Sequence, residues 1–99
     1  MKTGKNSTIY KYDICTWGYL TLLLPVGAEI IKYALQDGVP HIWVFIPDRD
    51  IKPSVLRHFF VAVTGGPLPE NKDLVHIDTI FKGGLVYHLF EVFEEGQVS

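Results

Sequence analysis

The hydrophobic residues of this chain form short runs, and clusters of Gly, Pro, Asp and Asn separate one run from the next. The runs are rich in Val, Ile, Leu, Tyr, Phe and Trp, whose branched and aromatic side chains fit a pleated sheet, whereas Gly and Pro supply turns. This pattern predicts an all-β domain of six to seven antiparallel strands, arranged as a small barrel or a sandwich.

Two runs indicate different positions in such a sheet. Ile9–Ile14 alternates between apolar and polar residues, which is typical of a half-buried strand. Val55–Val63 is apolar on both faces, which is typical of a central strand. The remaining clear strands are expected at Tyr19–Leu24, Leu74–Phe81 and Leu85–Phe93.

The segment Ala28–Gln36 fits two structures. Its apolar residues have helical spacing, so an α+β fold with one short helix at Ala28–Leu35 is an alternative. The same segment also fits a strand that ends at the hairpin dipeptide Asp37-Gly38 and returns through Ile42–Ile46. Pro40 lacks a backbone donor, so we expect the loop after that turn to extend to it. The local pattern leaves both structures open.

The chain has 99 residues, enough for one domain and one core. We expect residues 1–8 and 95–99 to be flexible, because both ends are polar. The formal net charge is −2 and the basic residues are scattered, which argues against general nucleic-acid binding.

The sequence favours a cytoplasmic protein. The single cysteine, Cys15, cannot form an internal disulfide, which favours a reducing compartment. The first residues lack the apolar segment of a secretion signal, and the longest apolar stretch, Tyr19–Leu24, is too short to cross a bilayer. We therefore expect no membrane association.

No catalytic constellation is evident, and we expect no catalytic residue, no metal and no cofactor. The four histidines, His41, His58, His76 and His88, lie on four different segments without zinc-motif spacing. One alternative stays open. His76 and Asp78 would share one face of a strand and, with His88, could form the site of a metal-dependent hydrolase.

The aromatic content is the stronger lead. The chain has two Trp, five Tyr and six Phe, more rings than a core of this size can hide. Exposed Tyr and Trp favour protein interfaces or stacking against a planar ligand. The candidate binding residues are Tyr33, Trp43 and Tyr87, with Arg57 as a charged partner and His88 as either a hydrogen-bonded core residue or the polar end of a pocket.

Three segments of the chain are similar to those of a family of small phage and prophage proteins that carries a domain of unknown function. They are Leu24-Pro25-Val26-Gly27-Ala28 running on through Asp37-Gly38 to Trp43, then Val63-Thr64-Gly65-Gly66-Pro67-Leu68-Pro69, and Gly83-Gly84-Leu85-Val86-Tyr87-His88-Leu89-Phe90-Glu91. Tyr87 stands where that family more often has Trp, and Val63 replaces a glycine. The resemblance implies a β-rich fold in which Ala28–Gln36 is a strand, and a viral or prophage origin. It implies no catalytic residue.

Three functions are consistent with these observations. The first is a non-enzymatic phage or prophage accessory protein that binds a host or phage protein, as a homo-oligomer in the host cytoplasm. The second is a small-ligand protein that binds signalling nucleotides and counteracts host defence, by aromatic stacking with Arg57 or Lys82 against phosphate. The third is the metal-dependent hydrolase.

Overall fold

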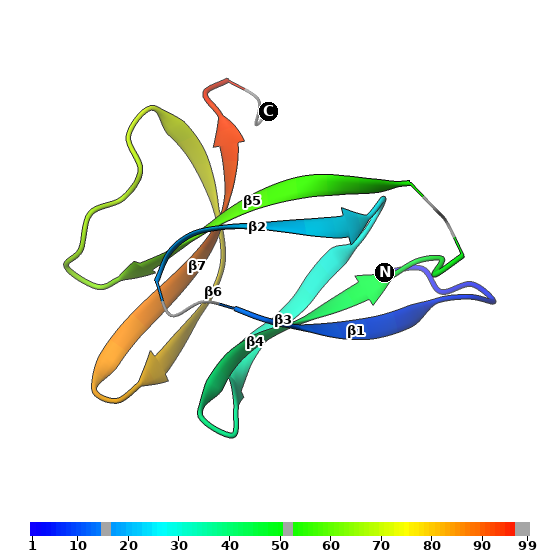
Figure 1. The fold of residues 1–99 in the computed structure, drawn as a ribbon, viewed down its shortest axis with the longest axis horizontal. Coiled ribbons are helices and arrows are strands. Elements are labelled where there is room, and N and C mark those ends of the chain that lie inside the picture. Colours follow the sequence, from blue (N-terminus) through cyan, green and yellow to red (C-terminus); the bar gives the residue numbers. More distant parts are fainter. Residues whose placement is uncertain (15–16, 51–52, 97–99) are drawn as a thin grey trace.

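The computed structural model describes residues 1–14, 17–50 and 53–96. Within these residues the chain forms strands and no helix, in two antiparallel sheets (Figure 1). A three-stranded sheet has the order β1-β4-β3 and a four-stranded sheet the order β2-β5-β7-β6. The strands are β1 (Thr8–Asp13), β2 (Gly18–Pro25), β3 (Glu29–Gln36), β4 (Val39–Ile46), β5 (Ser54–Val63), β6 (Lys72–Lys82) and β7 (Leu85–Glu94). The predicted all-β class is confirmed, and the sheets do not close into a barrel.

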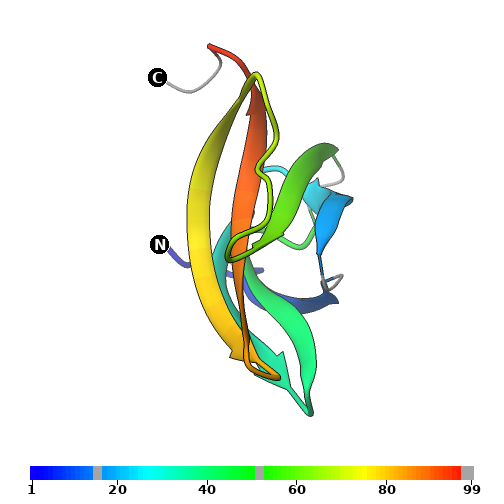
Figure 2. The same cartoon turned by 90° about the vertical axis from the view of Figure 1, so that its left-hand side faces the viewer.

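The two sheets meet along their edge strands β3 and β6, which contact each other. The molecule is flat, with extents of 43 × 37 × 19 Å, and Figure 2 shows it edge-on. In the described part of the chain, no helix is long and apolar enough to span a membrane.

One hydrophobic core lies between the sheets. In β4 the alternate residues Ile42, Val44 and Ile46 are fully buried, and in β5 Phe59 and Val61 occupy the same layer from the other sheet. Burial of each such side chain contributes about 1.5–3 kcal/mol to folding, before the entropy of ordering it is subtracted. The other buried members of this core are Ile14, Leu24, Ala28, Tyr33, Ile80, Tyr87 and Leu89.

The segment Ala28–Gln36 contains strand β3, so the alternative of a short helix at Ala28–Leu35 is wrong. β3 pairs with β4 in a hairpin whose turn residues, Asp37 and Gly38, have φ of 52° and 77°. Two positive φ values in a two-residue turn match the twist of the flanking strands. A bulge between Ile30 and Lys32 interrupts the period of two in β3, which explains the misleading helical spacing.

Pro40 lies in the ladder and not in a loop, which corrects the prediction made from its missing donor. The pair that flanks a two-residue turn, Gln36 and Val39, exchanges hydrogen bonds, so the next pair, Leu35 and Pro40, does not. The nitrogen of Pro40 therefore points away from β3. Its carbonyl accepts a 3.0 Å hydrogen bond from Ile14 N, just beyond the last residue of β1.

The predicted central position of Val55–Val63 is confirmed, because β5 lies between β2 and β7. In β6 a register shift separates His76, which is opposite Phe90, from Asp78, which is opposite the fully buried Leu89. Neighbouring residues of β7 point to opposite faces, so His76 and Asp78 do too. The prediction that these two side chains share one face is wrong because the sequence pattern does not reveal the bulge.

The residues before β1 contact the loop that follows β4. Asn6 and Ser7 lie inside the segment predicted to be flexible, yet Asn6 O accepts a 3.0 Å hydrogen bond from Arg49 N. The Ser7 hydroxyl donates a 2.8 Å hydrogen bond to the carbonyl of Pro47. Thr8 already pairs with Ile46. At the other end, residues 97–99 lie outside the described residues.

Candidate binding site

The four-stranded sheet divides at one end. β5 and β7 pair from Val63 and Tyr87 to His58 and Val92, and then β5 continues beside β2 alone while β7 continues beside β6 alone (Figure 1). The gap between the diverging strands forms a cleft of about 510 Å³, which we call the fork cleft. It is lined by Tyr19, Leu56, Arg57, His58, Lys72, Glu91, Val92, Phe93 and Glu94.

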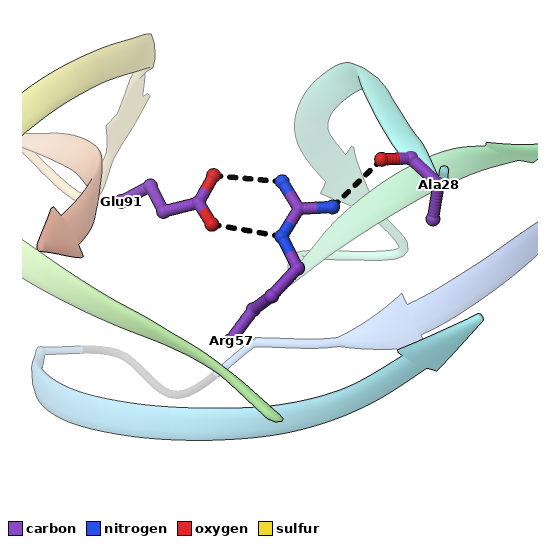
Figure 3. Close-up of polar contacts among 3 residues, drawn as sticks. All are labelled: Ala28, Arg57 and Glu91. Carbon is purple, nitrogen blue, oxygen red and sulfur yellow. Dashed lines mark hydrogen bonds and ion pairs between the residues drawn. The ribbon is translucent and has the colours of Figure 1, made fainter. Parts of the chain in front are cut away.

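Arg57 and Glu91 join the two sides of the fork cleft. The Nε and Nη2 atoms of Arg57 donate hydrogen bonds of 2.8 and 2.7 Å to the two carboxylate oxygens of Glu91 (Figure 3). Nη1 donates a 2.7 Å bond to the carbonyl of Ala28, just before β3. The two side chains are 22% and 13% exposed. This bidentate pair fixes the fork and also ties the four-stranded sheet to the chain that enters the other sheet.

A second ion pair lies at the outer side of the cleft. Lys72 Nζ is 2.9 Å from both carboxylate oxygens of Glu94, and this hydrogen bond raises the pKa of Lys72 above its ordinary value. The His58 Nδ1 atom lies 3.0 Å from the Thr21 hydroxyl. Arg57 and Lys72, the Arg and Lys among the described residues that line the cleft, therefore each contact a carboxylate, and the formal charges of these two ion pairs cancel.

Beside the cleft, the outer face of β2 and β5 carries an apolar surface. Tyr19 and Leu23 are 61% and 62% exposed, and Leu56 is 63% exposed. The ring of Tyr19 packs edge-on against Phe60 at a centroid distance of 4.9 Å. The register arranges three directly opposite pairs, which together we call the β2–β5 stripe: Tyr19 with Phe60, Thr21 with His58, and Leu23 with Leu56.

Two of the predicted binding residues lie in the core. Tyr33 on β3 is 2% exposed and Tyr87 on β7 is 8% exposed, so their rings fill the space between the sheets. A partner at the surface cannot reach either ring. Arg57 is the predicted binding residue that does line the fork cleft.

Trp43 and His88 lie apart from the cleft. Trp43 is half-buried on the outer face of the three-stranded sheet, 6.0 Å from the ring of His41. His88 is half-buried, and its Nε2 and Nδ1 atoms lie 2.7 Å from the Thr64 hydroxyl and 2.9 Å from the Thr79 hydroxyl. Because both ring nitrogens have hydrogen-bond partners, His88 fits the interpretation of a hydrogen-bonded structural residue.

The hydroxyl of Thr79 lies between two of the histidines, His76 and His88. Thr79 also lies 2.9 Å from His76 Nε2, so a hydroxyl stands between the rings of His76 and His88, whose centroids are 6.3 Å apart. Among the described residues, no three His, Cys, Asp or Glu side chains are grouped so that they could hold a metal ion. Cys15 lies outside those residues.

The surface exposure of the apolar residues of the stripe was not predicted from the sequence. Alternation places Tyr19, Thr21 and Leu23 on one face of β2, but the opposite face carries leucines and is equally apolar. A strand that is apolar on both faces does not indicate which face the core covers. The single polar residue Thr21 is the one signal that could have identified the outer face.

The comparisons with known proteins give a family and no function. The model of a domain of unknown function, DUF7352, matches residues 5–98. The chain belongs to this family. No curated protein and no solved structure matches the chain. The function of this DUF7352 protein must therefore be argued from its surface.

Proposed function

We propose that this DUF7352 protein is a small non-enzymatic phage or prophage accessory protein that acts by binding another protein through the β2–β5 stripe and the adjoining fork cleft. The observation that carries this proposal is the exposure of Tyr19, Leu23 and Leu56 on one face beside a cleft. The resemblance of three sequence segments to phage and prophage proteins supports a phage or prophage origin of the chain.

The chemistry of the stripe suits a protein interface. A cluster of exposed apolar side chains costs free energy in water, and larger patches of this kind mark interaction sites. Tyr19 offers a large apolar ring with a polar hydroxyl, a combination that is enriched among residues dominating binding energy. Lys72 and Glu94, which line the adjoining fork cleft, provide polar groups like those at the border of a typical interface.

Nucleotide binding has less support at this site. Phosphate recognition needs a cation that is available to the ligand. In the fork cleft, three N–H groups of Arg57 are engaged by Glu91 and Ala28, and Lys72 contacts Glu94. A phosphate would have to displace a carboxylate already in place.

The proposal is tested with a tagged chain as bait in lysate of the host that carries the phage or prophage. We expect wild type to capture a protein that Leu56→Asp does not, because a carboxylate at this position cannot be desolvated in an apolar interface. Ile9→Asp is the matched control, since Ile9 is 52% exposed and lies on β1 of the other sheet.

The captured protein is then purified and titrated against the three chains by calorimetry. The proposal requires that Leu56→Asp weakens binding at least tenfold, about 1.4 kcal/mol, while Ile9→Asp binds like wild type. Equal binding by all three chains, or the absence of a captured protein, would remove the proposal.

A further inference from the structure

Among the described residues, none gives the edge strand β2 the features that keep the edges of sheets from pairing with other chains. Natural sheets protect an edge with charges, a bulge or a covering element. β1 carries Lys11 and Asp13, β6 carries a bulge and several charges, and β3 carries a bulge and lies against β6. β2, with the sequence Gly-Tyr-Leu-Thr-Leu-Leu-Leu-Pro, has no charge and no register shift.

The hydrogen bonds at the end of β2 show which of its backbone groups face outward. Val26 N donates a 3.2 Å hydrogen bond to the carbonyl of Pro53, in continuation of the β2–β5 register. Pairs in an antiparallel ladder alternate between bonded and non-bonded. The backbone groups of Tyr19, Thr21 and Leu23 therefore point away from β5, toward the outer edge.

The groups at the end of this edge are already accounted for. Pro25 follows the same alternation, and its nitrogen carries no hydrogen, as is common for proline on an edge strand. Its carbonyl accepts a 3.1 Å hydrogen bond from Ala28 N. The edge that β2 presents thus consists of three consecutive outward residues, each with one N–H donor and one C=O acceptor.

We propose that a second copy of this chain pairs with β2 in antiparallel orientation, with Thr21 opposite Thr21 of the partner subunit. Tyr19 then lies opposite Leu23 of the partner subunit, and the reverse pair is identical by symmetry. All three pairs join residues whose backbone groups face outward, so the two strands make about six hydrogen bonds, two per pair. The pairing satisfies the whole outward edge.

The side chains are self-complementary in this register. An aromatic ring opposite a leucine and a threonine opposite a threonine are favourable cross-strand pairs, each contributing about 0.2–1 kcal/mol. On the core side, Leu20 lies opposite Leu22 of the partner subunit. A symmetric dimer needs such a surface, because the same residues form both halves of the interface.

The same arrangement is unfavourable at β1. Ile14 N donates to Pro40 O in continuation of the β1–β4 register, so Ile9, Lys11 and Asp13 face outward. Full antiparallel overlap of two β1 strands would place Lys11 opposite Lys11 of the second copy, and like charges directly opposite are destabilising. The dimer therefore forms through β2.

This dimer joins the two four-stranded sheets into one continuous sheet, with both β2–β5 stripes on the same face. The dimer does not depend on the proposed function. Pairing uses the backbone edge of β2, whereas the proposed binding surface includes the outer face of β2.

The test replaces the central residue of the strand with opposite charges. We expect the wild-type chain to have twice the 11.2 kDa mass of one chain in sedimentation equilibrium. Thr21→Lys and Thr21→Glu should each have the mass of one chain, because each places like charges opposite one another. An equimolar mixture of the two variants should recover the dimer mass, because lysine then lies opposite glutamate.

Recovery of the dimer mass in the mixture would show that both variants are folded. A monomer mass for each variant alone would not show this, because an unfolded chain is also monomeric. Ile9→Lys, on the edge of the other sheet, is the control and should keep the dimer mass. A wild-type chain that stays monomeric at millimolar concentration would overturn the proposal. So would a dimer that persists in Thr21→Lys, or a mixture that stays monomeric.

Discussion

At the scale of single residues, Arg57 links three parts of the chain that are distant in sequence. Its guanidinium contacts Glu91 on β7 and the carbonyl of Ala28 before β3. From the sequence, the charge of Arg57 predicts contact with a ligand, because its carboxylate partner is 34 residues away and is not evident from the sequence. Which charges meet across a sheet depends on register, and the composition of a strand does not determine register.

We predict that Arg57 and Glu91 stabilise the fold as a coupled pair. Arg57→Met and Glu91→Leu should each lower the free energy of unfolding by about 2–3 kcal/mol, because each leaves a partly buried charge without its partner. The double variant should cost less than the sum of the two, by about 1–2 kcal/mol, in urea unfolding. Lys72→Met, at the more exposed Lys72–Glu94 pair, should lower the free energy of unfolding far less than either of these single variants, because solvent screens an exposed ion pair. Additive effects of the two single variants would contradict this coupling.

Tyr12 gives a prediction about pH. Burial, with a smaller contribution from Tyr10, raises the pKa of Tyr12 above its ordinary value of 10.0. The pKa of Tyr12 is higher in the folded chain than in the unfolded chain, because burial disfavours the phenolate. The contribution of Tyr12 to the free energy of unfolding is therefore fully present below pH 10.0 and is lost as the pH rises through the folded-state pKa. Tyr12→Phe should therefore lose less stability than wild type between about pH 8 and about pH 11 in urea unfolding. Equal losses in the two proteins would refute this role.

At the scale of elements, most of the strands could be predicted from the sequence. Strand positions follow from runs of branched and aromatic residues between turn residues, and the central position of β5 follows from its two apolar faces. The bulges in β3 and β6 could not be predicted, because one extra residue changes the face of every later side chain without a distinctive sequence signal. The place of Pro40 within the β3–β4 ladder could not be predicted either, because it depends on whether its nitrogen faces the partner strand β3.

The β3–β4 turn should depend on its glycine. Gly38 has a φ of 77°, a conformation that strains a residue with a Cβ. We expect Gly38→Ala to lower the free energy of unfolding by about 1 kcal/mol or more, which is about 4–8 °C in melting temperature for a domain of this size. Gly4→Ala is the control, because Gly4 has no positive φ and an added Cβ would approach only the Ser7 hydroxyl, at 3.9 Å. An unchanged melting temperature for Gly38→Ala would contradict this account.

At the scale of the whole molecule, both sheets depend on one core. Phe59 of the four-stranded sheet and Val44 of the three-stranded sheet are both fully buried in it. The candidate site was less predictable than this core. Its cleft exists because β5 and β7 stop pairing at His58 and Val92, and such a termination depends on the twist of the assembled sheet.

The shared core predicts that both sheets unfold together. Phe59→Ala should lower the free energy of unfolding by about 3–5 kcal/mol. In a Trp17→Phe background, Trp43 reports on the three-stranded sheet, and its fluorescence transition should coincide with that of far-ultraviolet circular dichroism. Phe81→Ala is the control and should change stability by no more than about 0.5 kcal/mol, because Phe81 is 74% exposed. Separate transitions for the two probes would show that the sheets unfold independently.

The uncharged sequence of β2 also has a consequence for newly made chains. A segment that pairs with its own copy after folding can also pair with it before the sheet is assembled, when many chains are still unfolded. We therefore expect fibrillar growth to compete with folding, so that the yield of refolded protein falls as its concentration rises. Pro25 at one end of the segment limits that growth, since it interrupts the backbone ladder that a fibril extends.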